Sequence, residues 1–246
     1  MTDRPLRDQR IVLIGGSSGI GLATAEAAAR QGARVVLAGR NAERLAAARK
    51  AVGEAETHAL DATDESALAA FFRALGAIDH VANFVTAAPN AEVRQAMGTF
   101  MATPQWAMEA ILRNKFWSQV FTARHARPQM REGGSIVFVT GQAHRKHLPT
   151  YSAIAAADSA VETLARVLAV ELAPVRVNVV APGLIATPLL RTLPPAVQAT
   201  FDARTAPQPV PRMGRPEEIS DAILWVMANA YVTGSVLDVD GGFKLT

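Results

Sequence analysis

The segment GGSSGIG, residues 15–21, has residue types and spacing suited to holding a phosphate group. It follows a short aliphatic run and opens a stretch of helical spacing. Glycines at such a junction permit a tight turn and let backbone N–H groups approach a pyrophosphate, which then lies at the positive end of the helix dipole. We therefore predict a dinucleotide-binding turn made by Gly15, Ser17, Ser18, Gly19, Ile20 and Gly21.

Tyr151 is a second residue with chemical capacity, because it stands at the head of an alanine-rich stretch of helical spacing. A phenol beside a bound substrate can serve as a general acid or base. A tyrosine can equally bury its ring and leave its hydroxyl in water. The residue itself therefore leaves two roles open, catalytic acid and bystander.

The elements that would position these residues follow from an alternation of short aliphatic runs with alanine-rich stretches, which is typical of βαβ units around a parallel sheet. Strands are expected at 10–16, 33–39, 56–61, 79–85, 134–140, 175–182 and 235–241. Helices are expected at 19–31, 41–52, 64–75, 104–130, 152–173 and 216–229. The sequence thus predicts an α/β fold, one Rossmann domain over residues 1–246 with a doubly wound, seven-stranded parallel sheet flanked by helices.

Composition narrows the possible functions. The chain has 246 residues, half of them hydrophobic, and no cysteine, which excludes disulfides and thiolate zinc sites, and we expect no metal. Its 25 basic and 22 acidic residues are scattered, so no nucleic-acid partner is expected. The polar first ten residues and the short first apolar run predict no membrane partner and a cytoplasmic location.

Two segments near the expected carboxyl ends of the strands lack a clear period. Residues 187–215 carry six prolines (188, 194, 195, 207, 209 and 211), which we expect to stop regular structure and leave a substrate loop. The basic cluster HRKH at 144–147 is interpreted as a solvated loop after a strand. We therefore interpret its two histidines, His144 and His147, as surface groups rather than catalytic ones.

The spacing GxxxGxG, together with VRVNVVAPGLIATP and VTGSVLDVDGG, resembles the short-chain dehydrogenase/reductase family over essentially the whole chain. The resemblance implies an oxidoreductase that transfers hydride between a nicotinamide cofactor and a small carbonyl or alcohol substrate. It also implies a homotetramer or dimer built on the helices at 104–130 and 152–173.

The resemblance also implies the cofactor contacts. At the end of the second strand the chain has Arg40 and Asn41 without a carboxylate, and a guanidinium suits the 2′-phosphate, so NADP(H) is favoured over NAD(H). At the positions of the family's NNAG segment the chain has Asn83, Phe84, Val85 and Thr86. The first asparagine is kept, and bulkier side chains form the wall against the cofactor. The remaining implied cofactor contacts are Asp61, Ala62, Pro182, Gly183, Ile185 and Thr187.

The family's catalytic serine, tyrosine and lysine are missing from the matching positions. Alignment of SAVETLARVLAVELAP and of GSIVFVTG gives one register, in which these positions are Gly141, Ile154 and Asp158. The family's asparagine corresponds to Lys115, and shifting the alignment by one residue would place Asn114 at that position. Tyr151 then lies about one helical turn before the tyrosine position.

Three functions are compatible with these substitutions. In the first, the protein is an oxidoreductase whose proton chemistry has moved to Tyr151, Lys115 or a histidine of 144–147, with Lys115 and Asp158 forming an ion pair near the cofactor. In the second, it binds NADP(H) without hydride transfer, as a sensor or assembly subunit. In the third, it is a non-redox enzyme on the same fold, since a fold does not determine chemistry.

Overall fold

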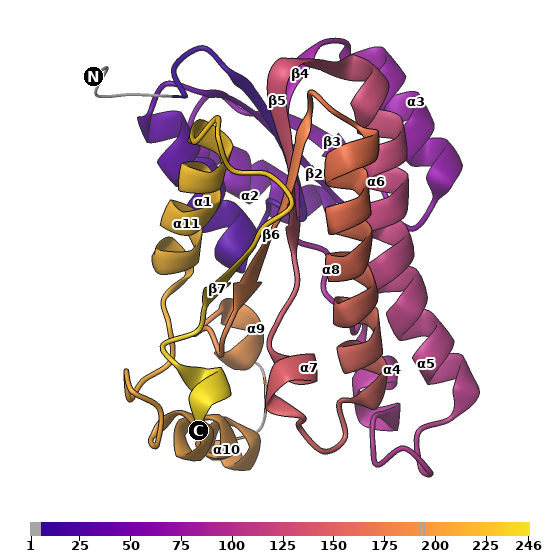
Figure 1. The fold of residues 1–246 in the computed structure, drawn as a ribbon, viewed down its shortest axis with the longest axis vertical. Coiled ribbons are helices and arrows are strands. Elements are labelled where there is room, and N and C mark those ends of the chain that lie inside the picture. Colours follow the sequence, from indigo (N-terminus) through magenta and orange to yellow (C-terminus); the bar gives the residue numbers. More distant parts are fainter. Residues whose placement is uncertain (1–5, 192, 194) are drawn as a thin grey trace.

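The computed structural model describes residues 6–191, 193 and 195–246, and it contains one sheet of seven strands in the order β3-β2-β1-β4-β5-β6-β7 (Figure 1). Every neighbouring pair is parallel. The strands are β1 (Arg10–Ile14), β2 (Arg34–Gly39), β3 (Glu56–Ala59), β4 (Ile78–Asn83), β5 (Met130–Val139), β6 (Arg176–Pro182) and β7 (Val236–Val239). The predicted Rossmann fold is confirmed.

Helices cover both faces of the sheet, as Figure 1 shows. On one face α1 (Gly19–Arg30), α2 (Ala42–Val52) and α11 (Pro216–Ala228) form a core cluster with the strands. On the other face α3 (Glu65–Leu75), α6 (Ser118–Ala126) and α8 (Ser152–Glu171) form a second cluster. Because both faces are covered, the central strands are apolar without alternation, and all seven residues of β6 are buried.

The strand order reverses between β1 and β4, since the chain builds outward from β1 in one direction and from β4 in the other. In open parallel sheets this switch point leaves a crevice beyond the carboxyl ends of the strands, where ligands bind. The glycine-rich segment follows β1 directly and leads into α1. The topology therefore places the predicted phosphate-binding turn beside this crevice.

The helix expected at 104–130 is present but interrupted. It consists of α5 (Gln105–Leu112), a π-helical turn η1 (Arg113–Trp117), α6 and a 3₁₀ turn η2 (Arg127–Gln129). The π-helical turn contains both Asn114 and Lys115, which are buried. Single π turns inside α-helices occur often at functional sites.

The expectation of irregular structure across 187–215 is wrong. This segment contains α9 (Pro188–Arg191) and α10 (Pro195–Thr205), and a proline begins each helix. Proline fits the first turn because its φ angle is already helical and its missing N–H would have no partner there. Pro207, Pro209 and Pro211 do lie outside regular structure, whereas Pro194 lies outside the described residues.

The described residues also contain three short elements that the sequence pattern did not indicate. They are α4 (Ala91–Ala96), α7 (Ala143–Lys146) and η3 (Phe243–Leu245). Both α4 and α7 lie near the carboxyl ends of the strands in Figure 1. No helix in the described ranges is long and apolar enough to cross a membrane.

His80 on β4 makes the stability of this fold depend on pH. Its ring is 3% exposed, with Nδ1 2.8 Å from Ser135 Oγ and Nε2 2.6 Å from Gln9 Oε1. Burial, with a smaller effect of Arg176, lowers the pKa of His80 from 6.5 to about 4. Between these two values the unfolded chain binds more protons at this position than the folded protein does.

We therefore expect the free energy of unfolding to fall by about 3 kcal/mol from this residue as the pH drops from 6.5 through 4. Urea denaturation at several pH values measures it, and His80→Gln should flatten the profile. Changing the exposed His147 to asparagine should leave the profile as it is. An unchanged profile in His80→Gln would show that this ring does not control the acid limb.

Candidate functional site

A cleft of about 1040 Å³ lies at the carboxyl ends of the strands. Every site residue expected from the sequence lines it, with the exception of Asn83. The expected residues in its wall are Gly15, Ser17, Ser18, Gly19, Ile20, Gly21, Arg40, Asn41, Asp61, Ala62, Phe84, Asn114, Lys115, Tyr151, Asp158, Pro182, Gly183, Ile185 and Thr187. Residues from distant parts of the chain thus form one continuous wall.

Asn83 lies behind this wall. It is fully buried at the end of β4, and its amide nitrogen donates to the Ser118 carbonyl at 3.2 Å and to Thr122 Oγ1 at 2.9 Å. Its oxygen accepts from the Val85 N–H at 2.8 Å. Asn83 therefore ties β4 to α6 and shapes the backbone that presents Phe84 to the cleft.

The glycine-rich turn fits a pyrophosphate. Gly15 has a φ of +83°, and a Cβ on Gly21 would lie 2.4 Å from the Gly15 carbonyl oxygen, so neither position accepts a side chain readily. Ser18 is the N-cap of α1, and within the described structure its hydroxyl does not cap the helix. The first amides of α1 therefore face the cleft region without that competitor, as anion binding at a helix start requires.

Arginine side chains line the cleft after β2 and on α4. Arg40 donates to the Pro89 carbonyl at 3.1 Å, which links the end of β2 to the segment before α4. Asn41 caps α2 by accepting from the Arg44 N–H at 2.8 Å. Arg44 and Arg94 also line the cleft, and sequence reasoning missed both. This set of guanidinium groups suits a phosphate ester.

Lys115 and Asp158 face each other in the cleft wall. Lys115 Nζ donates to the Val139 carbonyl at 2.7 Å and lies 3.8 Å from Asp158 Oδ1, and the two side chains are 8% and 2% exposed. Burial lowers the pKa of Lys115, opposed by Asp158, and burial raises the pKa of Asp158, opposed by Lys115. Burial thus disfavours the charged form of each residue, and the attraction between the two charges opposes that effect.

Asp158 is held to Lys115 by charge and not by a hydrogen bond. Its Oδ1 is buried and has no hydrogen-bond partner among the described residues. A Cβ on Gly141 would lie 3.2 Å from Asp158 Oδ2, so the glycine leaves the room that this carboxylate occupies. The neighbouring Asn114 donates its amide to the Thr86 carbonyl at 2.9 Å and thereby holds the wall that follows β4.

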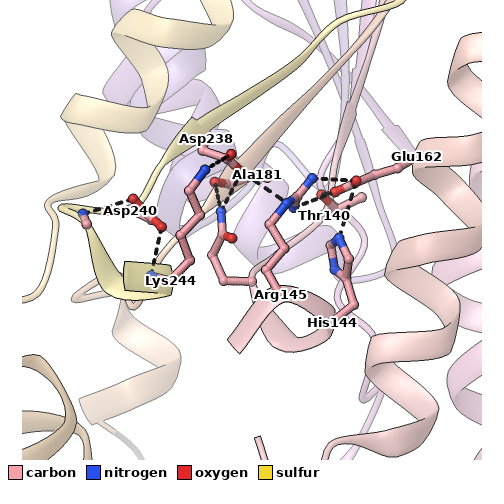
Figure 2. A network of polar contacts seen from close by, with 10 residues as sticks. Thr140, His144, Arg145, Glu162, Ala181, Asp238, Asp240 and Lys244 are labelled. Carbon is pink, nitrogen blue, oxygen red and sulfur yellow. Dashed lines mark hydrogen bonds and ion pairs between the residues drawn. The ribbon is translucent and has the colours of Figure 1, made fainter. Parts of the chain in front are cut away.

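The cluster at 144–147 is not the solvated loop that we expected. Its first three residues belong to α7, and Arg145 donates to both carboxylate oxygens of Glu162 at 2.9 and 2.6 Å (Figure 2). His144 Nε2 lies 3.3 Å from the same carboxylate, which is almost fully buried on α8. His147 remains exposed. The buried carboxylate explains why this basic segment folds inward.

The same network reaches β7. Arg145 lies 3.4 Å from Asp238 (Figure 2). Gln142 donates to Asp238 at 2.8 Å and to the Ala181 carbonyl at 2.9 Å. Glu162 follows Asp158 by one helical turn, a spacing that could have indicated a shared face. The role of Asp238 had no such local signal. No described group of three or more His, Cys, Asp or Glu side chains is placed to hold a metal.

Tyr151 precedes α8 and lines the cleft one turn before Ile154. The guanidinium carbon of Arg204, from α10, lies 5.8 Å from the centre of its ring. Tyr151 is therefore packed against the substrate-loop segment on one side and open to the cleft on the other.

Comparison with known proteins agrees with the fold. A family model described as enoyl-(acyl carrier protein) reductase matches residues 15–244. The chain is 36% identical to cis-4-hydroxycyclohexanecarboxylate dehydrogenase of Sinomonas cyclohexanicum, over 94% of this chain and 95% of the relative. It is 32% identical to short-chain dehydrogenase/reductase ATR9 of Stachybotrys chlorohalonatus, over 96% and 97%. A small-chain dehydrogenase solved in complex with NADPH has a TM-score of 0.83 and 30% identity, over 97% and 100%.

The Lys115–Asp158 pair predicts a specific pattern of stabilities. Lys115→Met leaves a buried carboxylate without its counter-charge, and Asp158→Asn does the same to the ammonium. Each change should lower the free energy of unfolding by about 3–5 kcal/mol, and the double variant should lose clearly less than the sum.

Urea denaturation of the four proteins measures this cycle. Lys50→Met, which removes an exposed lysine from α2, is the control and should change stability by less than about 0.5 kcal/mol. Strictly additive losses would mean that the two groups do not interact as charges.

Proposed function

The chain belongs to the short-chain dehydrogenase/reductase family, and from this premise we propose that it is an NADP(H)-dependent oxidoreductase with an atypical active site, acting on a small carbonyl or alcohol substrate. The observation that carries the proposal is the single cleft in which the glycine-rich turn, the arginines after β2 and the Lys115–Asp158 pair meet. When bound, the nicotinamide supplies or accepts the hydride.

The preference for NADP(H) rests on charge. Arg40 and Arg44 after β2 and Arg94 on α4 line the cleft, and the end of β2 carries no carboxylate that would repel a 2′-phosphate. The similar structure that contains NADPH supports the same choice. A glycine-rich turn alone would accept either cofactor, so the preference for NADP(H) depends on the arginines.

The active site is atypical because Gly141, Ile154 and Asp158 occupy the positions of the family's serine, tyrosine and lysine. None of these three side chains is a hydroxyl or an ammonium. In this proposal Lys115 Nζ–H donates to the substrate oxygen and stabilises the negative charge that develops there during carbonyl reduction. Because burial lowers its pKa, the same ammonium gives up a proton to that oxygen more readily than an exposed lysine does.

Asp158 positions this lysine and favours its protonated form. With the Val139 carbonyl it directs Nζ, and its carboxylate favours the ammonium against the effect of burial. In alcohol oxidation the order is reversed, and a neutral Lys115 accepts the proton from the substrate hydroxyl. Tyr151 and Asn114 border the same space, Tyr151 as a cleft-facing phenol and Asn114 through the wall that it holds.

A second candidate function is NADP(H) binding without hydride transfer, in a sensor or an assembly subunit. The missing hydroxyls at Gly141 and Ile154 favour it, because loss of a general acid costs about 10²–10⁴-fold in rate. A non-redox reaction on the same fold is the third possibility.

Self-association and a cytoplasmic location belong to the same proposal. Helix α5, the π turn and α8 expose large apolar side chains at Trp106, Trp117, Val167 and Val170, which supports a dimer or tetramer built on these helices. The absence of cysteine agrees with a reducing compartment.

The cofactor choice predicts an effect of Arg40. Titration monitored by nicotinamide fluorescence should show tighter binding of NADPH than of NADH, and Arg40→Ala should weaken NADPH about tenfold or more while leaving NADH unchanged. Arg49→Ala, on the helix α2 that follows Arg40 but outside the cleft lining, is the control. Equal affinity for both cofactors in the unaltered protein would refute the preference.

The role of Lys115 predicts a loss of turnover without a loss of cofactor. Across a panel of carbonyl and alcohol substrates, Lys115→Met should lower kcat about 10²–10⁴-fold and leave NADPH affinity within about threefold. The variant is assayed at a temperature at which its circular dichroism matches that of the unaltered protein. Unchanged turnover would remove Lys115 from the mechanism.

A further inference from the structure

Two buried carboxylates lie one helical turn apart on α8. Asp158 is 1% exposed and Glu162 is 3% exposed, and their i, i+4 spacing puts both on the same face of the helix. Two anions at that spacing oppose each other's ionisation. In the described structure Lys115 forms an ion pair with Asp158 and not with Glu162. The second negative charge therefore needs a cation of its own.

Arg145 supplies this cation. Its guanidinium donates to Glu162 Oε1 at 2.9 Å and to Glu162 Oε2 at 2.6 Å, the two-point geometry in which arginine binds a carboxylate most strongly (Figure 2). Thr140 Oγ1 also donates to Glu162 at 3.2 Å, and His144 Nε2 lies 3.3 Å from the same carboxylate. Glu162 is thus held as an anion whose charge Arg145 neutralises.

A second carboxylate fixes the position of Arg145. The guanidinium lies 3.4 Å from Asp238 on β7, and Asp238 is itself held by a hydrogen bond from Gln142 and an ion pair with Lys244. An arginine remains charged at any physiological pH, because its pKa lies above 12. Arg145 is therefore a permanent positive charge in a fixed place beside α8.

The segment 139–141 at the end of β5 contacts both ion pairs. Its first residue accepts a hydrogen bond from Lys115 through the backbone carbonyl, and the hydroxyl of its second residue donates to Glu162. Its third residue is the glycine at which a Cβ would lie 3.2 Å from Asp158 Oδ2. The Lys115–Asp158 pair and the Arg145–Glu162 pair therefore share one short stretch of wall.

The ionisation of Asp158 responds to the charges around it. Burial raises the pKa of Asp158 and Lys115 lowers it. Of the other charged neighbours, which come from α7 and α8, His144 and Arg145 lower this pKa and Glu162 raises it. An unpaired Glu162 would therefore favour the neutral form of Asp158, and Lys115 would lose its counter-charge.

We propose that Arg145 is a positioning residue of the proposed active site: by neutralising Glu162 it keeps Asp158 ionised as the counter-charge that directs Lys115. Arg145 does not belong to the lining of the cleft and acts through the two carboxylates of α8. Its importance for turnover rests on the proposed function, whereas its effect on Asp158 requires neither cofactor nor substrate. A contact that only joined α7 to α8 would have no such dependence on charge.

Carbon-13 NMR of protein labelled at the aspartate side-chain carboxyls measures the ionisation of Asp158, whose resonance is identified by its absence in Asp158→Asn. Arg145→Gln should raise the pKa of Asp158 by about one pH unit or more, because it leaves a buried anion one turn away. Arg145→Lys keeps the charge and should retain most of the original pKa.

The double variant Arg145→Gln/Glu162→Gln should return the pKa of Asp158 to within about half a pH unit of the original, because it removes both members of a neutral pair. Should Arg145→Gln not fold, Glu162→Gln gives the complementary test, since removal of this anion should lower the pKa of Asp158. Glu171→Gln, which changes an exposed carboxylate at the end of α8, is the control and should have no effect.

An unchanged pKa of Asp158 in Arg145→Gln or in Glu162→Gln would overturn this role. A double variant whose pKa is no closer to the original than that of Arg145→Gln would also overturn it, and would leave Arg145 as a structural contact between α7 and α8. With an active substrate, the acid limb of the kcat profile should follow the pKa of Asp158 in each variant. The expected titrations in a protein that converts no substrate would keep the effect of Arg145 on Asp158 and refute the oxidoreductase.

Discussion

The interpretation of this protein depends on the contact between a buried lysine and a buried aspartate at the cleft wall. Removing two charges from water is costly, and their attraction offsets that cost only when the geometry is good. Here Lys115 is held by a backbone carbonyl, and Asp158 fits beside a glycine that has no side chain to displace it. Both residues belong to the lining of the cleft, and in the proposed reaction a substrate oxygen approaches the lysine.

The surrounding structure can be understood as support for this pair. The π turn directs Lys115 inward from the helical segment that covers the sheet, and α8 supplies Asp158 from the opposite side. One turn further along α8, Glu162 accepts hydrogen bonds from Arg145 and so holds α7 against α8 (Figure 2). This contact anchors the start of the loop that leads from α7 to Tyr151. Charged groups are thus distributed along the cleft wall, which contains Arg40, Arg44 and Arg94 as well as the Lys115–Asp158 pair.

Much of this arrangement was predictable from local sequence patterns. The strands are continuous apolar runs, so they were located correctly, and the glycine-rich turn lies between β1 and α1 as its pattern indicated. The helices begun by Pro188 and Pro195 were missed because proline was interpreted only as a helix breaker. The inward position of Arg145 depends on a carboxylate 17 residues away and on Asp238 in another strand, which no local pattern reveals. The orientation of Asn83 toward α6 has the same cause, since its partners are tertiary contacts.

Transfer of deuterium from NADPH labelled at the nicotinamide C4 tests most directly the proposal that this cleft performs redox chemistry through Lys115. The protein is incubated with the labelled cofactor and a panel of carbonyl compounds, and the products are analysed by mass spectrometry. We expect one deuterium in the alcohol product, at a rate that falls about 10²-fold or more in Lys115→Met. A protein that binds NADPH and transfers no deuterium to any member of the panel would contradict the proposed reaction and favour a binding role.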